Sequence, residues 1–214
     1  MRISSISRTG RPGFLAGLII GVLTLTAAAC GSSTSSAPAA AASPSHHPMA
    51  SHHAMAEGAV FGSDCGMVPA TGMGSLHSMS MDPVVTAAVH NPLLTTLAKD
   101  IKITGLTGDL NTMHTITVFA PANAAFAKLP ASAMTMMHSQ AELTKVLKYH
   151  VVNGTVTTAQ LASGKPLTTL EGSTLKPSKM GAVYEVNNAD IICGNVHTAN
   201  ATVYIINKVL TPMH

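Results

Sequence analysis

The sequence predicts an α+β fold in which helices come first and a largely antiparallel sheet follows. Apolar residues recur at helical spacing over residues 84–101 and 143–149, and a β-rich alternating stretch occupies residues 115–119. From residue 167 onward, short β-like runs are separated by Gly, Asn and Asp. Helices grouped ahead of strands are typical of an α+β domain, whereas alternating helices and strands would indicate a parallel sheet.

Two helices are predicted ahead of the first strand. Asp82 and Pro83 mark the first start, because Asp is a favoured N-cap and Pro is favoured at the first helical position. Asn91 and Pro92 repeat the signal. The apolar side chains at helical spacing after these two starts are Val84, Val85, Ala88 and Val89, then Leu93, Leu94, Leu97 and Ile101.

The middle of the chain is predicted to hold the strand and two further helices. Pro121 ends the strand, and Asn123 is expected to cap a short helix that follows it. Ser139 opens a longer helix that runs to about Tyr149. The strands expected after it are the runs at 167–170, 174–175, 182–186, 191–192 and 203–210. We expect a shared core formed by Phe119, Phe126, Val151 and Tyr204.

The first 29 residues have the pattern of an export signal. Three arginines lie within residues 1–13, an uncharged and mostly apolar run covers residues 14–29, and that run ends in three alanines. This order is typical of a secretory signal peptide, and the apolar run is short for a membrane-spanning helix. The remaining chain has nine lysines and nine acidic residues. A basic surface for binding nucleic acid is therefore excluded as a first interpretation.

Cys30 directly follows the signal and is the predicted site of lipidation. A small-residue signal that ends before a cysteine is similar to that of bacterial lipoproteins, although Ala27 stands where Leu is usual. The lipid on Cys30 would anchor the protein in the lipid bilayer, which is thus a predicted partner. The alternative is ordinary cleavage after residues 27–29, which leaves Cys30 as a terminal thiol. Residues 30–60 then read as a disordered tether, because this stretch is rich in Ser, Ala, Pro, His and Met.

Histidines and methionines gather in the tether and suggest a possible second activity, metal binding. Thioethers are soft ligands that suit Cu(I), and imidazoles suit copper and zinc. The candidate ligands are His46, His47, Met49, His52, His53 and Met55. The alternative is that these residues are merely tolerated in a linker, and that the later methionines fill gaps in a core with few aromatic residues.

No catalytic motif is present in the sequence. It has no G-x-S-x-G elbow, no C-x-x-C, no H-E-x-x-H and no phosphate-binding loop, and its nine acidic residues are scattered. We therefore expect a protein that is not an enzyme and that requires no cofactor, with copper or zinc as the only metals to consider.

Five segments of the chain follow one another in a characteristic order: TVFAPANAAF at 117–126, YHVV at 149–152, LEGSTL at 170–175, NNADI at 187–191 and NATVYIINKVL at 200–210. Together they resemble a fasciclin (FAS1) domain, and among such proteins the secreted and lipoprotein fasciclin antigens of mycobacteria. The resemblance implies a single FAS1 domain at 79–212, with helices on a sheet wedge, preceded by an extension at 61–78. Two residues depart from the family pattern: Ala122 replaces a usual Thr or Ser, and Asn207 replaces a frequent Asp.

The resemblance also bears on the cysteines and on three candidate site residues. With Cys30 claimed by lipid, Cys65 and Cys193 remain, and two exported thiols are expected to pair. The related antigens have a similarly placed pair; the alternative is two buried, reduced thiols. In fasciclin domains the Tyr-His segment, here Tyr149 and His150, is implicated in adhesion.

The alternative for His150 is a buried histidine that organises a helix–strand junction, and the alternative for Asn123 is a helix cap. The resemblance implies a non-catalytic adhesion or binding module. It would lie at the cell surface, face the envelope or the extracellular side, and have a protein or glycan ligand.

Overall fold

The computed structural model describes residues 58–212. The predicted signal peptide, Cys30 and most of the predicted tether lie outside these residues. The helical segments are η1 Cys65–Met67, α1 Leu76–Met81, α2 Val84–His90, α3 Thr95–Thr104, α4 Thr107–Thr112, α5 Asn123–Ala127, α6 Ala131–Met136, α7 Gln140–Tyr149 and α8 Thr158–Ser163. The strands are β1 Ile116–Pro121, β2 Val151–Asn153, β3 Leu167–Thr168, β4 Thr174–Leu175, β5 Pro177–Met180, β6 Val183–Val186, β7 Ala189–His197 and β8 Ala201–Ile206.

The main sheet has the strand order β2-β1-β8-β7-β6-β5, and β3 pairs with β4 in a separate two-stranded sheet. Every neighbouring pair in the main sheet is antiparallel except β1 and β8, which run parallel with Phe119 beside Tyr204. The α+β prediction with a largely antiparallel sheet is therefore confirmed. The sequence pattern did not predict the short helices α1, α4, α6 and α8.

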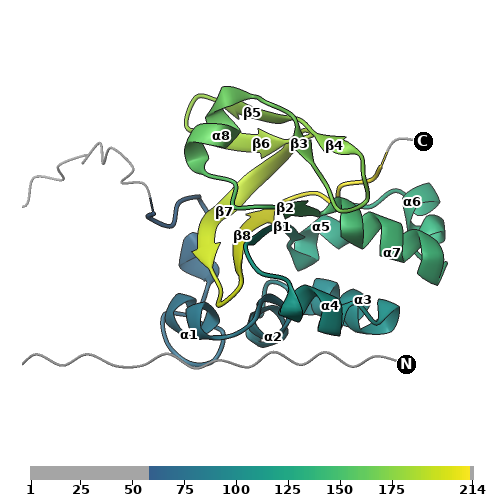
Figure 1. Cartoon of the computed structure of the whole chain (residues 1–214), viewed down its shortest axis with the longest axis horizontal. Helices are drawn as coiled ribbons and strands as arrows, with labels where there is room; N and C mark the ends of the chain where they lie inside the picture. Colours follow the sequence, from purple (N-terminus) through teal and green to yellow (C-terminus); the bar gives the residue numbers. More distant parts are fainter. Residues whose placement is uncertain (1–57, 213–214) are drawn as a thin grey trace, which may run out of the picture. The chain divides into compact units, whose positions relative to one another are not determined.

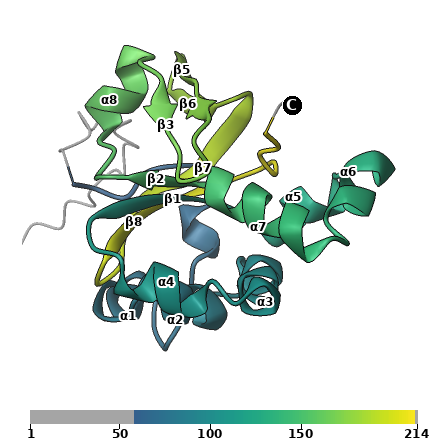
Figure 2. The ribbon, with the colours of Figure 1, turned by 45° about the vertical axis from the view of Figure 1, so that its right-hand side comes forward.

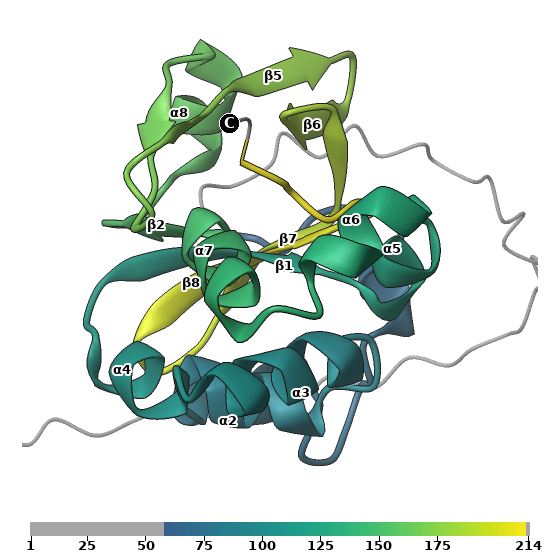
Figure 3. The ribbon, with the colours of Figure 1, turned by 90° about the vertical axis from the view of Figure 1, so that its right-hand side faces the viewer.

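Two layers of packing flank the central strands (Figures 1 and 2). Helices α1 to α4 lie along one side of β1 and β8, and α8 lies with β3, β5 and β6 on the other. Figure 3 shows the β5–β6 hairpin standing at the opposite end from α2 and α3. Within residues 58–212, no helix is both long enough and apolar enough to cross a bilayer.

The core is divided between these two sides, and this corrects the predicted four-residue cluster. Phe119 and Tyr204 are fully buried in one cluster, with their ring centroids 5.6 Å apart. Val151 is buried in the other cluster, against which the half-buried Phe126 packs. The physical reason is strand alternation: Val151 pairs with Val118, whose side chain points to the opposite face from that of Phe119.

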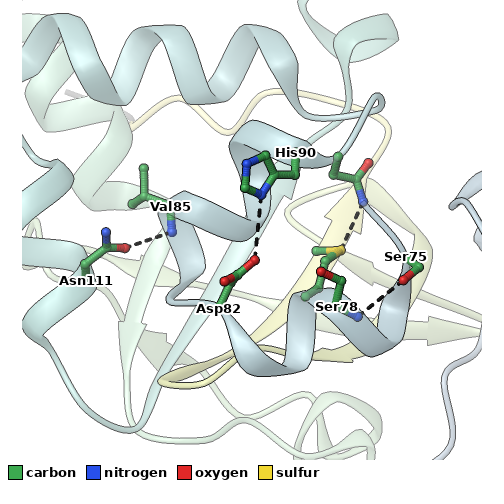
Figure 4. Close-up of polar contacts among 8 residues, drawn as sticks. Ser75, Ser78, Asp82, Val85, His90 and Asn111 are labelled. Atoms are coloured by element: carbon green, nitrogen blue, oxygen red, sulfur yellow. Dashed lines mark hydrogen bonds and ion pairs between the residues drawn. The ribbon is translucent and has the colours of Figure 1, made fainter. Parts of the chain in front are cut away.

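Two asparagine side chains from other elements cap the start of α2, which corrects the prediction that Asp82 caps it. Pro83, not Asp82, precedes the first residue of α2. The amide of Val84 donates to Asn200 Oδ1 at 2.9 Å, and that of Val85 donates to Asn111 Oδ1 at 3.0 Å (Figure 4). The Asp82 carboxylate instead lies 3.6 Å from Nδ1 of His90, at the other end of α2.

Candidate binding groove

The Tyr149–His150 segment lies in the interior, where α7 ends and β2 begins. Tyr149 is 3% exposed and His150 is 2% exposed. The Tyr149 hydroxyl accepts a hydrogen bond from Asn187 Nδ2 at 2.8 Å and donates to the carbonyl of Thr174 at 3.3 Å. These bonds hold the end of α7 against the β4–β6 region, and they leave neither side chain accessible to a partner protein.

Both ring nitrogens of His150 are occupied by backbone groups. Nδ1 lies 2.7 Å from the carbonyl of Val146, and Nε2 accepts from the amide of Leu210 at 3.0 Å. This pattern requires a neutral imidazole with its proton on Nδ1. Burial lowers the pKa of His150 from 6.5 to about 4, although the bond to Val146 acts in the opposite direction. The side chain thus joins α7 to the C-terminal segment after β8.

Asn123 is the first residue of α5, but its side chain caps a different helix. Its Oδ1 accepts from the amide of Thr96 at 2.9 Å in the first turn of α3, and its Nδ2 donates to the carbonyl of Pro92 at 2.8 Å. The prediction that it caps its own helix is wrong, because Ala122 occupies that position. Sequence pattern alone could not show this, since the two helices are linked only by tertiary packing.

Asn200 is an organising residue to which the sequence analysis gave no role of its own. Its Oδ1 caps α2, and its Nδ2 lies within hydrogen-bonding distance of the carbonyls of Leu110, Asn111 and Met113, at 2.8–3.3 Å. One amide side chain therefore joins α2, the end of α4 and the start of β8. Its place in the family-like segment 200–210 was the only available signal.

A disulfide joins Cys65 to Cys193 across 128 residues of sequence and fixes the N-terminal segment to β7. Beside it, Phe61 forms an antiparallel bridge with Gly194, and the amide of Asp64 donates to the carbonyl of Ile192. A Cβ on Gly194 would come within 2.4 Å of the Phe61 ring, so glycine is required for this packing. These backbone hydrogen bonds hold the segment against the part of β7 that does not pair with β6.

A groove of about 550 Å³ opens between this added segment and the β5–β6 hairpin. Its wall is mostly apolar, and its hairpin side carries Met180 and Val183, which are 67% and 44% exposed. Glu185 and Asp190 contribute the acidic part of the lining. The sequence analysis did not select these residues; the alternating run at 182–186 was the signal that could have directed attention to them.

Aromatic rings connect the groove to the core. Tyr184 in the groove lies 5.1 Å from Phe61, Phe61 lies 6.2 Å from Tyr204, and Tyr204 lies 5.6 Å from Phe119. Burial raises the pKa of Tyr204 to about 12, and its hydroxyl donates to the carbonyl of Val156 at 2.6 Å. The ring contacts therefore extend from the groove to the buried aromatic residues of the core.

The metal-binding hypothesis concerns residues that lie mainly outside the described part of the chain. His46, His47, Met49, His52, His53 and Met55 are not described. Within residues 58–212, no group of three or more His, Cys, Asp or Glu side chains is placed to hold a metal ion. The expectation that the later methionines fill the core holds for Met79, and Met113 and Met137 also pack against the core, whereas Met67, Met73 and Met81 are 62–72% exposed.

The fold belongs to a known class of domain. Residues 92–212 match the family model of the fasciclin domain, and the chain belongs to this family. The immunogenic protein MPB70 of Mycobacterium bovis is 43% identical over 152 residues, which cover 66% of this chain and 75% of MPB70. The cell surface glycolipoprotein MPB83 of the same organism is 43% identical over 148 residues, which cover 66% of each chain.

Similarity extends beyond mycobacteria. Protein sll1483 of Synechocystis is 34% identical over 132 residues, covering 60% of this chain and 73% of that protein. Among solved structures, a FAS1 domain pair from the insect cell adhesion molecule fasciclin I matches with a TM-score of 0.47. It is 19% identical, and the match covers 55% of this chain and 45% of that chain.

Proposed function

We propose that this protein is a non-catalytic binding module of the bacterial cell surface, held at the membrane by lipid on Cys30 and facing outward. Family membership and the similarity to a cell surface glycolipoprotein support this function. The observation that carries it is the apolar groove beside the disulfide, because exposed apolar side chains above a rigid floor are typical of a preformed contact surface.

The groove favours a protein ligand over a glycan. Sugars commonly stack on a free aromatic face, but the Tyr184 ring is already contacted by Phe61, and the Lys179 ammonium lies 5.0 Å above it. The remaining accessible wall consists largely of aliphatic and thioether carbon from Met180, Val183 and Ile192. Apolar side chains of a partner, flanked by basic groups that would meet Glu185 and Asp190, fit this surface best.

Adhesion can be tested with purified full-length chain on host cells and on immobilised matrix proteins. Met180→Lys combined with Val183→Lys should reduce binding at least about tenfold, because both charges would enter an apolar contact. Met134→Lys is the matched control, since Met134 is 49% exposed on α6 and lies outside the groove. Equal loss in both variants, or no loss in the double variant, would contradict the groove assignment. Binding that disappears after glycosidase treatment of the target would identify a glycan instead.

Anchoring can be tested separately through Cys30. The full-length chain expressed in a mycobacterial host should enter the detergent phase after temperature-induced separation, because lipoprotein acylation supplies the two chains that stable anchoring requires. Cys30→Ala should move it to the aqueous phase. If both forms partition alike, the lipid anchor is wrong, while the groove hypothesis stands on its own test.

A further inference from the structure

Three exposed soft or borderline donors recur at four-residue intervals at the start of the folded part. Met73 and Met81 are 68% and 72% exposed, and His77 lies midway between them, also exposed. The other methionine of α1, Met79, is 1% exposed and accepts a hydrogen bond from Asn91 Nδ2 at its sulfur. The three exposed side chains therefore have no part in the core.

Helical geometry places two of these donors on one face. His77 and Met81 are separated by four residues within α1, which puts them about 40° apart around the axis and about 5–6 Å apart at Cβ. Leu76 and Met79 occupy the opposite, inward face. The imidazole and the thioether are thus neighbours on the solvent side of the helix.

Met73 lies in the turn that immediately precedes α1. The amide of Ser75 donates to the carbonyl of Gly72 at 3.1 Å, so the chain turns immediately before α1. Ser75 then caps α1 by accepting from the amide of Ser78 at 3.3 Å (Figure 4). Side chains on a helix lean toward its N-terminus, so Met81 leans toward His77 and His77 leans toward the turn that carries Met73.

The electrostatic surroundings of this face do not oppose a cation. The last turn of α1 contains no basic residue, and His77 is the one ionisable residue within α1. Asp82 follows Met81 directly, and its carboxylate is about one third exposed beside His90. The carboxylate and the C-terminal end of α1 both place negative charge near the Met81 end of the set.

We propose that Met73, His77 and Met81 form a surface binding site for Cu(I). Two thioethers and one imidazole are soft to borderline ligands, a combination that selects Cu(I) over Zn(II), Mg²⁺ or Ca²⁺. Cu(I) binds readily with few ligands, so two donors on α1 and one in the turn before it are sufficient. This site lies on the folded domain, and it is distinct from the tether ligands at 46–55 and from the groove.

The test measures Cu(I) affinity anaerobically by competition with a chromogenic chelator. The starting protein is the full-length chain in which His46, His47, Met49, His52, His53 and Met55 are all replaced by Ala. It should retain one equivalent of Cu(I). Because even outer-shell changes cost metal sites about 10–100-fold in affinity, His77→Ala or Met81→Leu should each weaken binding at least about tenfold.

Met180→Leu provides the matched control, because Met180 is 67% exposed but has no histidine four residues away on a helix. Its affinity should equal that of the starting protein. Ag(I), a redox-inert substitute, should shift the methyl NMR signals of Met73 and Met81 while those of Met79 and Met180 stay unchanged. Loss of all Cu(I) binding in the starting protein would overturn the proposal, as would an equal effect of Met180→Leu.

Discussion

The Tyr149–His150 junction and the Met180–Val183 hairpin are both recognisable in the sequence, but the structure uses them in opposite ways. At the junction, every polar atom of the two side chains that can form a hydrogen bond does so, and both residues are almost fully buried. At the hairpin, the apolar side chains are largely exposed above a groove. The first region maintains the scaffold, and the second offers a surface.

This contrast shows which residues of a fasciclin domain to examine for binding. The segments that resemble the family, such as 117–126 and 149–152, supply buried strand residues, helix caps and junctions. Most of the groove residues, including Met180, Val183 and Glu185, fall outside those segments, whereas Asp190 lies within the segment 187–191. Resemblance in this protein therefore identifies the fold, whereas specificity has to be sought mainly in side chains that the family motifs do not include.

The largest expected difference in the free energy of unfolding, between a variant in the interior and one on the surface, concerns Phe119. Phe119→Ala should lower the free energy of unfolding by about 3–5 kcal/mol, because it removes a fully buried ring stacked on Tyr204. Met180→Ala, at the exposed hairpin, should change it by no more than about 0.5 kcal/mol. Urea unfolding followed by circular dichroism measures both values. Similar losses for the two variants would remove the distinction drawn between the two regions.

His150 should make the stability of the interior depend on pH. Its pKa is about 4 in the folded state and 6.5 when unfolded, so the unfolded chain binds the extra proton between these values. Stability should therefore be fully present above pH 6.5 and decrease as the pH falls toward 4, by roughly 3 kcal/mol in total. Urea unfolding at several pH values gives the slope.

The matched variant for this slope is His150→Gln, which cannot be protonated in that range. It should be less stable than the parent at pH 7, because at least one of the two backbone bonds would be lost. Its stability should vary much less between pH 6.5 and 4. If the dependence of stability on pH is the same in His150→Gln as in the parent, groups other than His150 cause the loss of stability in acid. That result would contradict a buried neutral His150.

Local patterns predicted the order of elements well and the tertiary contacts poorly. The helical spacing at 84–101 and 139–149 and the alternation at 115–119 depend on neighbouring residues, and the structure has α2, α3, α7 and β1 there. The division of Phe119 and Val151 between two core clusters depends on strand pairing, which composition does not reveal. The short helix α1 lacks an apolar repeat long enough to detect, so its His77–Met81 face became visible only in three dimensions.

The smallest predicted effect on stability concerns Asn123, whose side chain joins α5 to the start of α3. Asn123→Ala should lower stability by about 1–2 kcal/mol, because the amide of Thr96 loses its cap and the carbonyl of Pro92 loses a donor. Asn123→Asp retains the acceptor for Thr96 and should recover part of the loss. Hydrogen exchange should accelerate at Thr96 in the Ala variant, while the amides of α5 should be little affected. Faster exchange confined to α5 would instead show that Asn123 caps its own helix, as the sequence alone had predicted.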